Sequence, residues 1–155
     1  MNAIEMLKTQ HRAVEDLFGK FQSAESIGIR RRIFEQIADA LAIHTTIEER
    51  HFYPAVKSKA TESVLREAVE EHFELKHLVA DLLALGALDE TLEAKVSILR
   101  EDVERHMDEE EKILFSKVEK TIDDGKLRAI AAAMERTKGE LLEAGNPRDA
   151  LLQET

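Results

Sequence analysis

Apolar residues recur every three or four positions through most of the chain, which is the period of an amphipathic α-helix. The strict apolar–polar alternation of a strand is almost absent. The pattern predicts five helical segments, at about residues 2–23, 28–57, 61–85, 90–122 and 126–144. No linker or low-complexity segment interrupts the series, which indicates one all-α domain.

Four long helices with short links favour an up-down-up-down antiparallel four-helix bundle over residues 1–122. Asn2 and Glu5 have the spacing of a capping box at its start. The run Asp123-Asp124-Gly125 breaks the fourth helix. We expect residues 123–155 to form an additional C-terminal helix and a short polar tail on the same domain, where the helix packs outside the bundle or makes an oligomer contact.

Composition and charge exclude several functional classes. The chain has 22 Lys and Arg against 32 Asp and Glu, a net charge of −10, which argues against nucleic-acid binding. The absence of cysteine excludes disulfides, thiolate metal sites and a Cys nucleophile. The longest apolar run, 129–134, falls far short of the ~20 residues of a membrane span. With no signal-like N-terminal segment, we expect a cytoplasmic protein with no nucleic-acid or membrane partner.

Polar residues interrupt the predicted core-facing stripes. A histidine lies on the stripe of each bundle helix, at His11, His44, His72 and His106. Glu48 and Glu110 each follow one of these histidines by four residues. Buried imidazoles and carboxylates are costly unless they are paired or bound to a metal. The spacing alone is weak evidence because glutamate is abundant here, and a lone core histidine usually needs only a hydrogen bond.

Internal repetition is the stronger evidence. The stretch HTTIEERHFYPAV from His44 aligns with HMDEEEKILFSKV from His106, and HRAVEDLF from His11 aligns with HFELKHLV from His72. Each half is therefore a hairpin with one histidine on its first helix and His-x-x-x-Glu on its second. Two such hairpins related by a pseudo-two-fold axis would bring four histidines and two glutamates together, since residues i and i+4 share a helix face.

These side chains offer nitrogen and oxygen atoms without sulfur, a set that suits iron, manganese, zinc or cobalt. The two carboxylates would lie between two ions as bridges. Two divalent ions would then leave an excess of positive charge, which a bridging hydroxide or oxo group would reduce. The residues therefore favour a dinuclear site with an exogenous bridge.

At these positions the sequence resembles the hemerythrin-like, or HHE cation-binding, domain family. The resemblance rests on QHRAVEDLF, HTTIEERHFYPAV, EEHFELKHL and HMDEEEKILF, which together span residues 11–118. It implies a four-helix bundle with a non-haem di-iron centre, and thus two iron ions as the cofactor. The metal ligands it implies are His11, His44, Glu48, His72, His106 and Glu110.

The sequence departs from the oxygen-carrying branch of that family. Carriers have His-x-x-x-His on the third helix, whereas here Lys76 follows His72, and the last motif is His-x-x-x-Glu rather than His-x-x-x-x-Asp. Four histidines leave more open metal positions than five. We therefore expect a protein that reacts with oxygen, peroxide or nitric oxide, in peroxide removal or in redox, oxygen or iron sensing. We expect this protein to be a monomer, or a dimer through the C-terminal helix. A di-iron peroxidase, catalase-like or oxidase activity is the enzymatic form of this expectation.

Other polar residues near the motifs have less defined roles. We expect His51 in the core or an access channel, His77 on the surface, and Glu15 on the surface or beside the site. Tyr53 could donate to a bound oxygen species or simply pack. The pair Glu49 and Glu111 is expected on a solvated face, with hydrogen bonds to ligand histidines as the alternative.

Three rival hypotheses remain. The first is a metal-free interaction bundle in which the histidines are core hydrogen-bonding groups. The second is a ferritin-like di-metal carboxylate protein using Glu-x-x-His, which occurs at Glu48–His51 and Glu74–His77 but is not related by the repeat. The third keeps the metal but makes the protein a sensor whose fifth helix responds.

Overall fold

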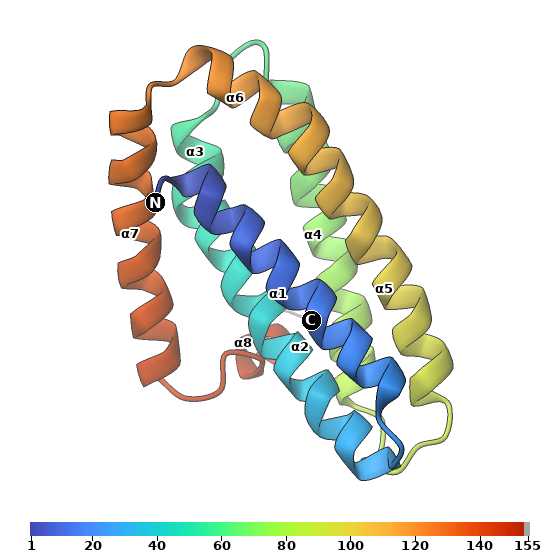
Figure 1. Ribbon diagram of the computed structural model, residues 1–155. Coiled ribbons are helices and arrows are strands. Elements are labelled where there is room, and N and C mark those ends of the chain that lie inside the picture. Colours follow the sequence, from blue (N-terminus) through green and yellow to red (C-terminus); the bar gives the residue numbers. More distant parts are fainter. Residues whose placement is uncertain (154–155) are drawn as a thin grey trace.

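The computed structural model describes residues 1–153 and contains helices and connecting turns, with no strand in that part of the chain (Figure 1). Two of its helical segments, η1 and η2, are single wide turns of π-helix. The elements are α1 Ala3–Ser23, α2 Ile27–Ile47, η1 Glu48–Phe52, α3 Tyr53–Ala55, α4 Glu62–Leu83, α5 Leu92–Glu109, η2 Glu110–Leu114, α6 Phe115–Thr121, α7 Asp124–Glu143 and α8 Asp149–Gln153.

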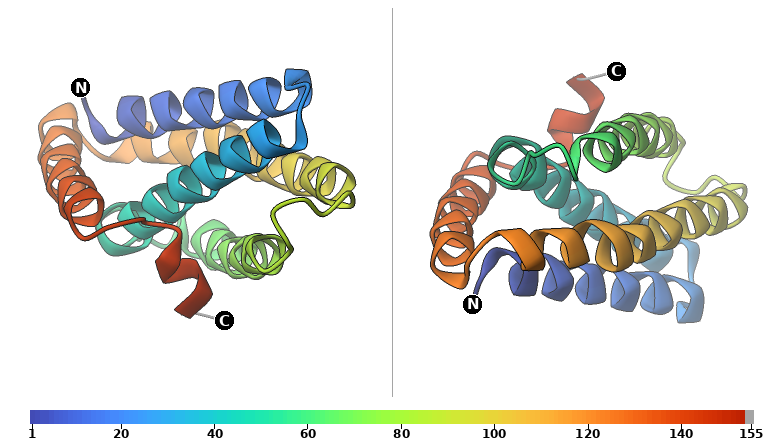
Figure 2. Two further views of the ribbon diagram at one scale, coloured as in Figure 1. Left: turned by 90° about the horizontal axis from the view of Figure 1, so that it is seen from below. Right: turned by 90° about the horizontal axis from the view of Figure 1, so that it is seen from above.

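Four helical rods build the bundle. The first and third are α1 and α4, the second is α2 continued through η1 into α3, and the fourth is α5 continued through η2 into α6. The rods alternate in direction, and α1 and α4 each pack against α2 and α5 (Figures 1 and 2). The expected all-α up-down-up-down bundle with an additional C-terminal helix is confirmed.

Side-chain caps define where three helices begin. The Asn2 side chain accepts from the Glu5 backbone N–H at 2.9 Å, and the Asn2 N–H donates to the Glu5 carboxylate at 3.3 Å, which confirms the capping box. Ser26 and Asp123 accept in the same way at the starts of α2 and α7. These contacts satisfy N–H groups that have no partner within the helix.

The apolar core is divided into two clusters. One, which includes Phe52, Phe115 and Met134, fills the end of the bundle beside α7. The other, which includes Phe18 and Phe34, fills the end where α1 joins α2. Buried histidines and glutamates from all four rods lie between the clusters, so the bundle has a polar layer near its middle.

The π-turns were not predicted, and they shift the register of the rods by one residue. In each, the sixth residue donates to the first, as Tyr53 N–H does to the Glu48 carbonyl. Ile113, which in a regular α-helix would share the core-facing side of His106 seven residues earlier, is consequently 45% exposed, whereas Leu114 and Phe115 are fully buried. The extra residue turns the aromatic side chains that follow each glutamate toward the core.

The C-terminal region packs along the bundle. Helix α7 lies against α1, α2 and η1, and the Asn2 amide donates to Asp124 at 2.9 Å (Figure 2). The expected polar tail instead contains the short helix α8, and Leu151 of this helix is buried in the second apolar cluster. Arg148 pairs with Asp39 at 2.8 Å and fastens this segment to α2. Every helix within residues 1–153 is too short or too polar to cross a bilayer.

Truncating the buried face of α7 should destabilise the whole bundle. Met134 is fully buried among the apolar residues of the first cluster, so Met134→Ala should lower the free energy of unfolding by about 2–5 kcal/mol. Leu142→Ala, at a position 53% exposed, is the matched control and should change it by less than about 0.5 kcal/mol. Urea unfolding followed by circular dichroism measures both, and a separate early transition for α7 would contradict a shared cooperative unit.

Candidate metal centre

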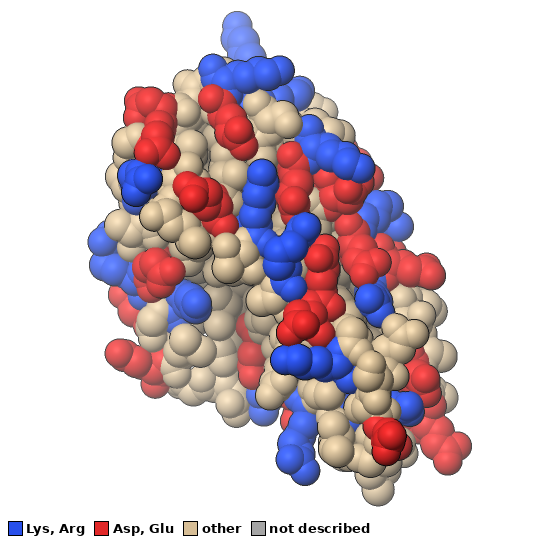
Figure 3. Space-filling view, in the orientation of Figure 1, with Lys and Arg blue, Asp and Glu red and all other residues tan. Residues whose placement is uncertain are grey.

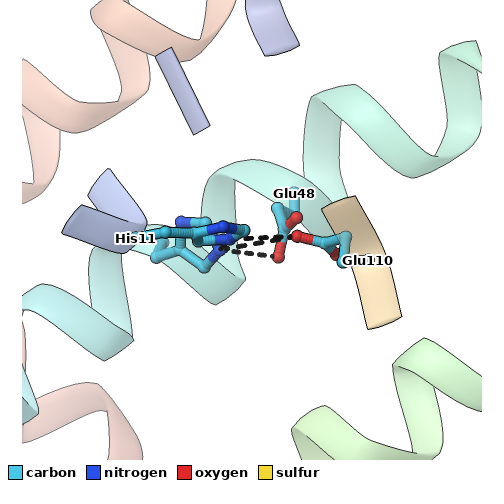
Figure 4. A group of neighbouring side chains, drawn as sticks. His11, Glu48 and Glu110 are labelled. Carbon is cyan, nitrogen blue, oxygen red and sulfur yellow. Dashed lines mark hydrogen bonds and ion pairs between the residues drawn. The ribbon is translucent and has the colours of Figure 1, made fainter. Parts of the chain in front are cut away.

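Six ionisable side chains converge in the polar layer. The histidines come one from each rod, and each glutamate is the first residue of a π-turn. Figure 4 shows Glu48 and Glu110 facing His11. None is more than 5% exposed, and the six residues are His11, His44, Glu48, His72, His106 and Glu110.

The six residues form two overlapping groups of four. One contains His11 and His44, the other contains His72 and His106, and both contain Glu48 and Glu110. Within each group the candidate ligand atoms all lie within 4.8 Å of one another. Each half of the repeat therefore supplies one histidine pair, and the two carboxylates lie between the pairs as bridging ligands would.

The Nδ1 atom of every histidine in the layer has a polar partner on a neighbouring helix. His11 Nδ1 contacts Glu111 at 2.7 Å, and His72 Nδ1 contacts Glu49 at 3.0 Å. The expectation that these two glutamates lie on a solvated face is wrong, because both are half-buried against a histidine. Such outer contacts fix the tautomer and orientation of a metal-binding imidazole.

Two of these partners were missed by the sequence analysis. His44 Nδ1 contacts the Gln10 side-chain oxygen at 2.7 Å, and His106 Nδ1 contacts Glu71 at 2.8 Å. Gln10 and Glu71 each directly precede a histidine of the layer, and they occupy equivalent positions in the repeat. That equivalence was the available signal.

The Nε2 atoms of the four histidines are placed where they could bind metal ions. Because each Nδ1 faces an acceptor, it carries the hydrogen, and the Nε2 of the neutral imidazole is then a lone pair. The Nε2 atoms nevertheless face each other at 3.2 Å in the His11–His44 pair and at 3.1 Å in the His72–His106 pair. Two lone pairs at that distance repel unless a proton or a metal ion lies against both. Glu48 Oε2 and Glu110 Oε1 are also buried without a hydrogen-bond partner, as metal-binding oxygens would be.

Electrostatics keep the layer charged. Burial opposes ionisation of Glu48, but the hydrogen bonds and charge of His44 and His72 hold the pKa of this carboxyl well below its usual value. Burial likewise opposes protonation of His72, but hydrogen bonds from its ring to Glu48 and Glu49 raise its pKa to about 9. Without a metal, a proton on His72 supplies positive charge beside the two buried carboxylates.

Comparison with known proteins identifies the family. Residues 2–118 match the hemerythrin HHE cation-binding domain. The chain belongs to this hemerythrin family. It is also similar to the hemerythrin HHE cation-binding domain-containing protein from Mycobacterium kansasii, a homologue of Rv2633c, with a TM-score of 0.82, 27% identity and coverage of 100% of this chain and 99% of that one.

A curated relative, a DNA nickase from Nostoc sp. strain PCC 7120, is 25% identical over 141 residues. The match covers 91% of this hemerythrin-family chain but only 40% of the length of that relative. The family binds metal cations, and the buried clusters of this chain are able to hold a metal.

One phenol reaches into the layer of this hemerythrin domain. Tyr53 is 4% exposed, and its hydroxyl donates to Glu110 Oε2 at 2.5 Å, with Glu48 Oε1 and His72 Nε2 each 3.2 Å away. Burial and the two carboxylates raise the Tyr53 pKa well above its usual value, so the phenol stays protonated. In the repeat its counterpart is Phe115, which stacks on His11 without a hydroxyl.

The remaining candidates lie outside both groups of four. His51 contacts Thr137 at 2.6 Å and so joins η1 to α7. His77 is half-buried and packs on Phe73, and Glu15 pairs with Arg12 at 3.4 Å. The two Glu-x-x-His pairs are therefore not brought together, which removes the geometric basis for a ferritin-like site.

Two cavities approach the centre. A cavity of about 650 Å³ lies between the α3 end of the second rod and α4, with Tyr53 and Glu49 in its wall. A cavity of about 40 Å³ between α4 and the fourth rod has His106 and Glu110 in its wall. Both lie on the side of the His72–His106 pair, so the space they enclose borders that half.

The metal-free protein should lose stability as the pH rises from 6.5 to about 9. The His72 pKa rises from 6.5 to about 9 on folding, so the stabilising proton is present below pH 6.5 and is lost as the pH passes about 9. The loss should be at most about 3 kcal/mol. Urea midpoints of chelator-treated protein measure it, with His72→Gln as the control that flattens the profile. A profile of wild-type protein that is already flat across this window would contradict the assignment.

Proposed function

We propose that this protein is a non-haem di-iron protein in which Glu48 and Glu110 bridge two ions. One ion would be held by His11 and His44, and the other by His72 and His106. The observation that carries the proposal is the pair of overlapping four-residue groups in one buried layer, each within ligand distance and sharing both carboxylates. Membership of a cation-binding family supports it.

The donor set admits several metals, and the family likeness favours iron among them. Imidazole and carboxylate ligands without sulfur suit iron, manganese, zinc or cobalt, and the hemerythrin likeness favours iron within that group. Two carboxylates balance only part of the charge of two divalent ions. A small anion from solvent between the ions would balance more of it.

The surroundings suit a reaction with a small oxidant. When bound, an iron pair supplies redox chemistry toward oxygen, peroxide or nitric oxide. The chain's own side chains contribute orientation, through the Nδ1 contacts, and exclusion of bulk water, through Phe52 and Phe115 on one side of the layer. Tyr53 keeps its proton beside the carboxylates and the larger cavity, where its hydroxyl can donate a hydrogen bond to a bound small molecule.

Four histidines, rather than the five of the carriers, favour reaction over reversible carriage. Two imidazoles and two shared carboxylates leave open positions at each ion, as catalytic metal sites do. Sensing is the second candidate, because the His51–Thr137 contact joins the π-turn that carries Glu48 to α7.

Nicking of DNA is not carried over from the Nostoc relative, since the net charge is −10 and acidic and basic side chains intermix over the face in Figure 3.

Metal analysis tests the proposed site. We expect about two iron equivalents per chain, and Glu48→Ala or Glu110→Ala should lose most of the bound iron because each carboxylate serves both positions. Glu15→Ala is the control and should retain it, since Glu15 pairs with Arg12 outside the layer. One equivalent in wild-type protein, or equal losses in all three variants, would contradict the assignment, and no bound metal would favour the interaction bundle.

Oxygen cycling separates reaction from carriage. Ferrous protein exposed to oxygen should change its optical spectrum. The reduced spectrum should not return when the gas is pumped away, because carboxylate ligands stabilise the higher iron charge. An added reductant should restore the reduced spectrum. Full recovery over repeated cycles without a reductant would identify a carrier.

A further inference from the structure

The repeat that builds the site is broken in the groups that support it. His11 and His72 are equivalent, and so are the residues before them, yet one is Gln10 and the other is Glu71. The equivalent pair Glu49 and Glu111 is conserved between the halves. The His72–His106 half therefore rests on two carboxylates, and the His11–His44 half on one carboxylate and one neutral amide.

This difference bears directly on metal affinity. A carboxylate that accepts from Nδ1–H makes the imidazole a stronger electron donor at Nε2, and removing such a partner typically costs about 10–100-fold in metal affinity. An amide oxygen orients the ring equally well but carries no charge. His44 and His106 are thus oriented in the same way, but only His106 has a charged partner at Nδ1.

The negative charge around Glu71 reinforces the difference. Glu71 belongs to a group with Glu67 and Glu109 whose carboxylate oxygens lie within 4.8 Å of one another. These three line the small cavity that has His106 and Glu110 in its wall. A cation approaching through this cavity is attracted by the carboxylates and reaches the His72–His106 half first.

We infer that the two metal positions are filled in order, the His72–His106 position before the His11–His44 position, and that Glu71 against Gln10 sets this order. Both act as positioning residues through their histidines. The inference rests on the proposed dinuclear site and adds to it that the two ions are bound with unequal affinity.

The test uses the full chain crystallised with one equivalent of Co²⁺, and anomalous scattering gives the occupancy of each position. In wild-type protein the His72–His106 position should hold about tenfold more metal than the other. The exchange variant Gln10→Glu/Glu71→Gln keeps all six ligands and should reverse the ratio. Calorimetric titration of both proteins should show two unequal steps in solution.

A second variant removes another asymmetry between the halves. Tyr53→Phe deletes the hydroxyl beside His72 and makes this position match Phe115, so it should leave the filling order unchanged. Equal occupancies in wild-type protein, an unchanged ratio in the exchange variant, or a ratio abolished by Tyr53→Phe would each overturn the inference while leaving the dinuclear site intact. Failure of two equivalents to bind at all would overturn the dinuclear site itself.

Discussion

Two carboxylates buried in the middle of the bundle are the constraint on which the rest of the molecule depends. Glu48 and Glu110 are at most 3% exposed, and each has one oxygen without a hydrogen-bond partner. Burial of such charge is costly unless positive charge lies beside it. Protons on the histidines can supply that charge, as the raised pKa of His72 shows, and two metal ions can supply it better. The polar layer, the divided apolar core and the outer contacts at Nδ1 all follow from placing this charge inside a helical bundle.

The repeat explains how a short chain builds a symmetric site, and its breaks explain why the halves differ. Both glutamates begin π-turns, and in both rods the turn directs the following aromatic residues inward. The hydroxyl of Tyr53 and the charge of Glu71 lie on the same half, and both cavities open toward that half. One half therefore combines nearby cavities, a hydrogen-bond donor and two carboxylates behind its histidines.

Local signals made the bundle and the six layer residues predictable. The helix period, the Asn2 capping box and each His-x-x-x-Glu motif can be recognised along a single helix, and the repeat is recognised by aligning the two halves of the chain. The π-turns were not predictable in this way, because a one-residue change of register depends on packing between rods. The change of register turns Ile113 toward solvent. Gln10 and Glu49 were missed or misplaced for a related reason: each contacts a histidine on another helix, and the pattern along one helix does not show which residues face across. The burial of Leu151 also depends on distant parts of the chain.

The proposed dinuclear site, with the two glutamates as bridges, can be tested by anomalous diffraction at the iron edge, from crystals of iron-loaded protein. We expect two peaks about 3.5–4 Å apart, one against His11 and His44 and the other against His72 and His106, with Glu48 and Glu110 between them. A single peak, or peaks only at surface carboxylates, would contradict it.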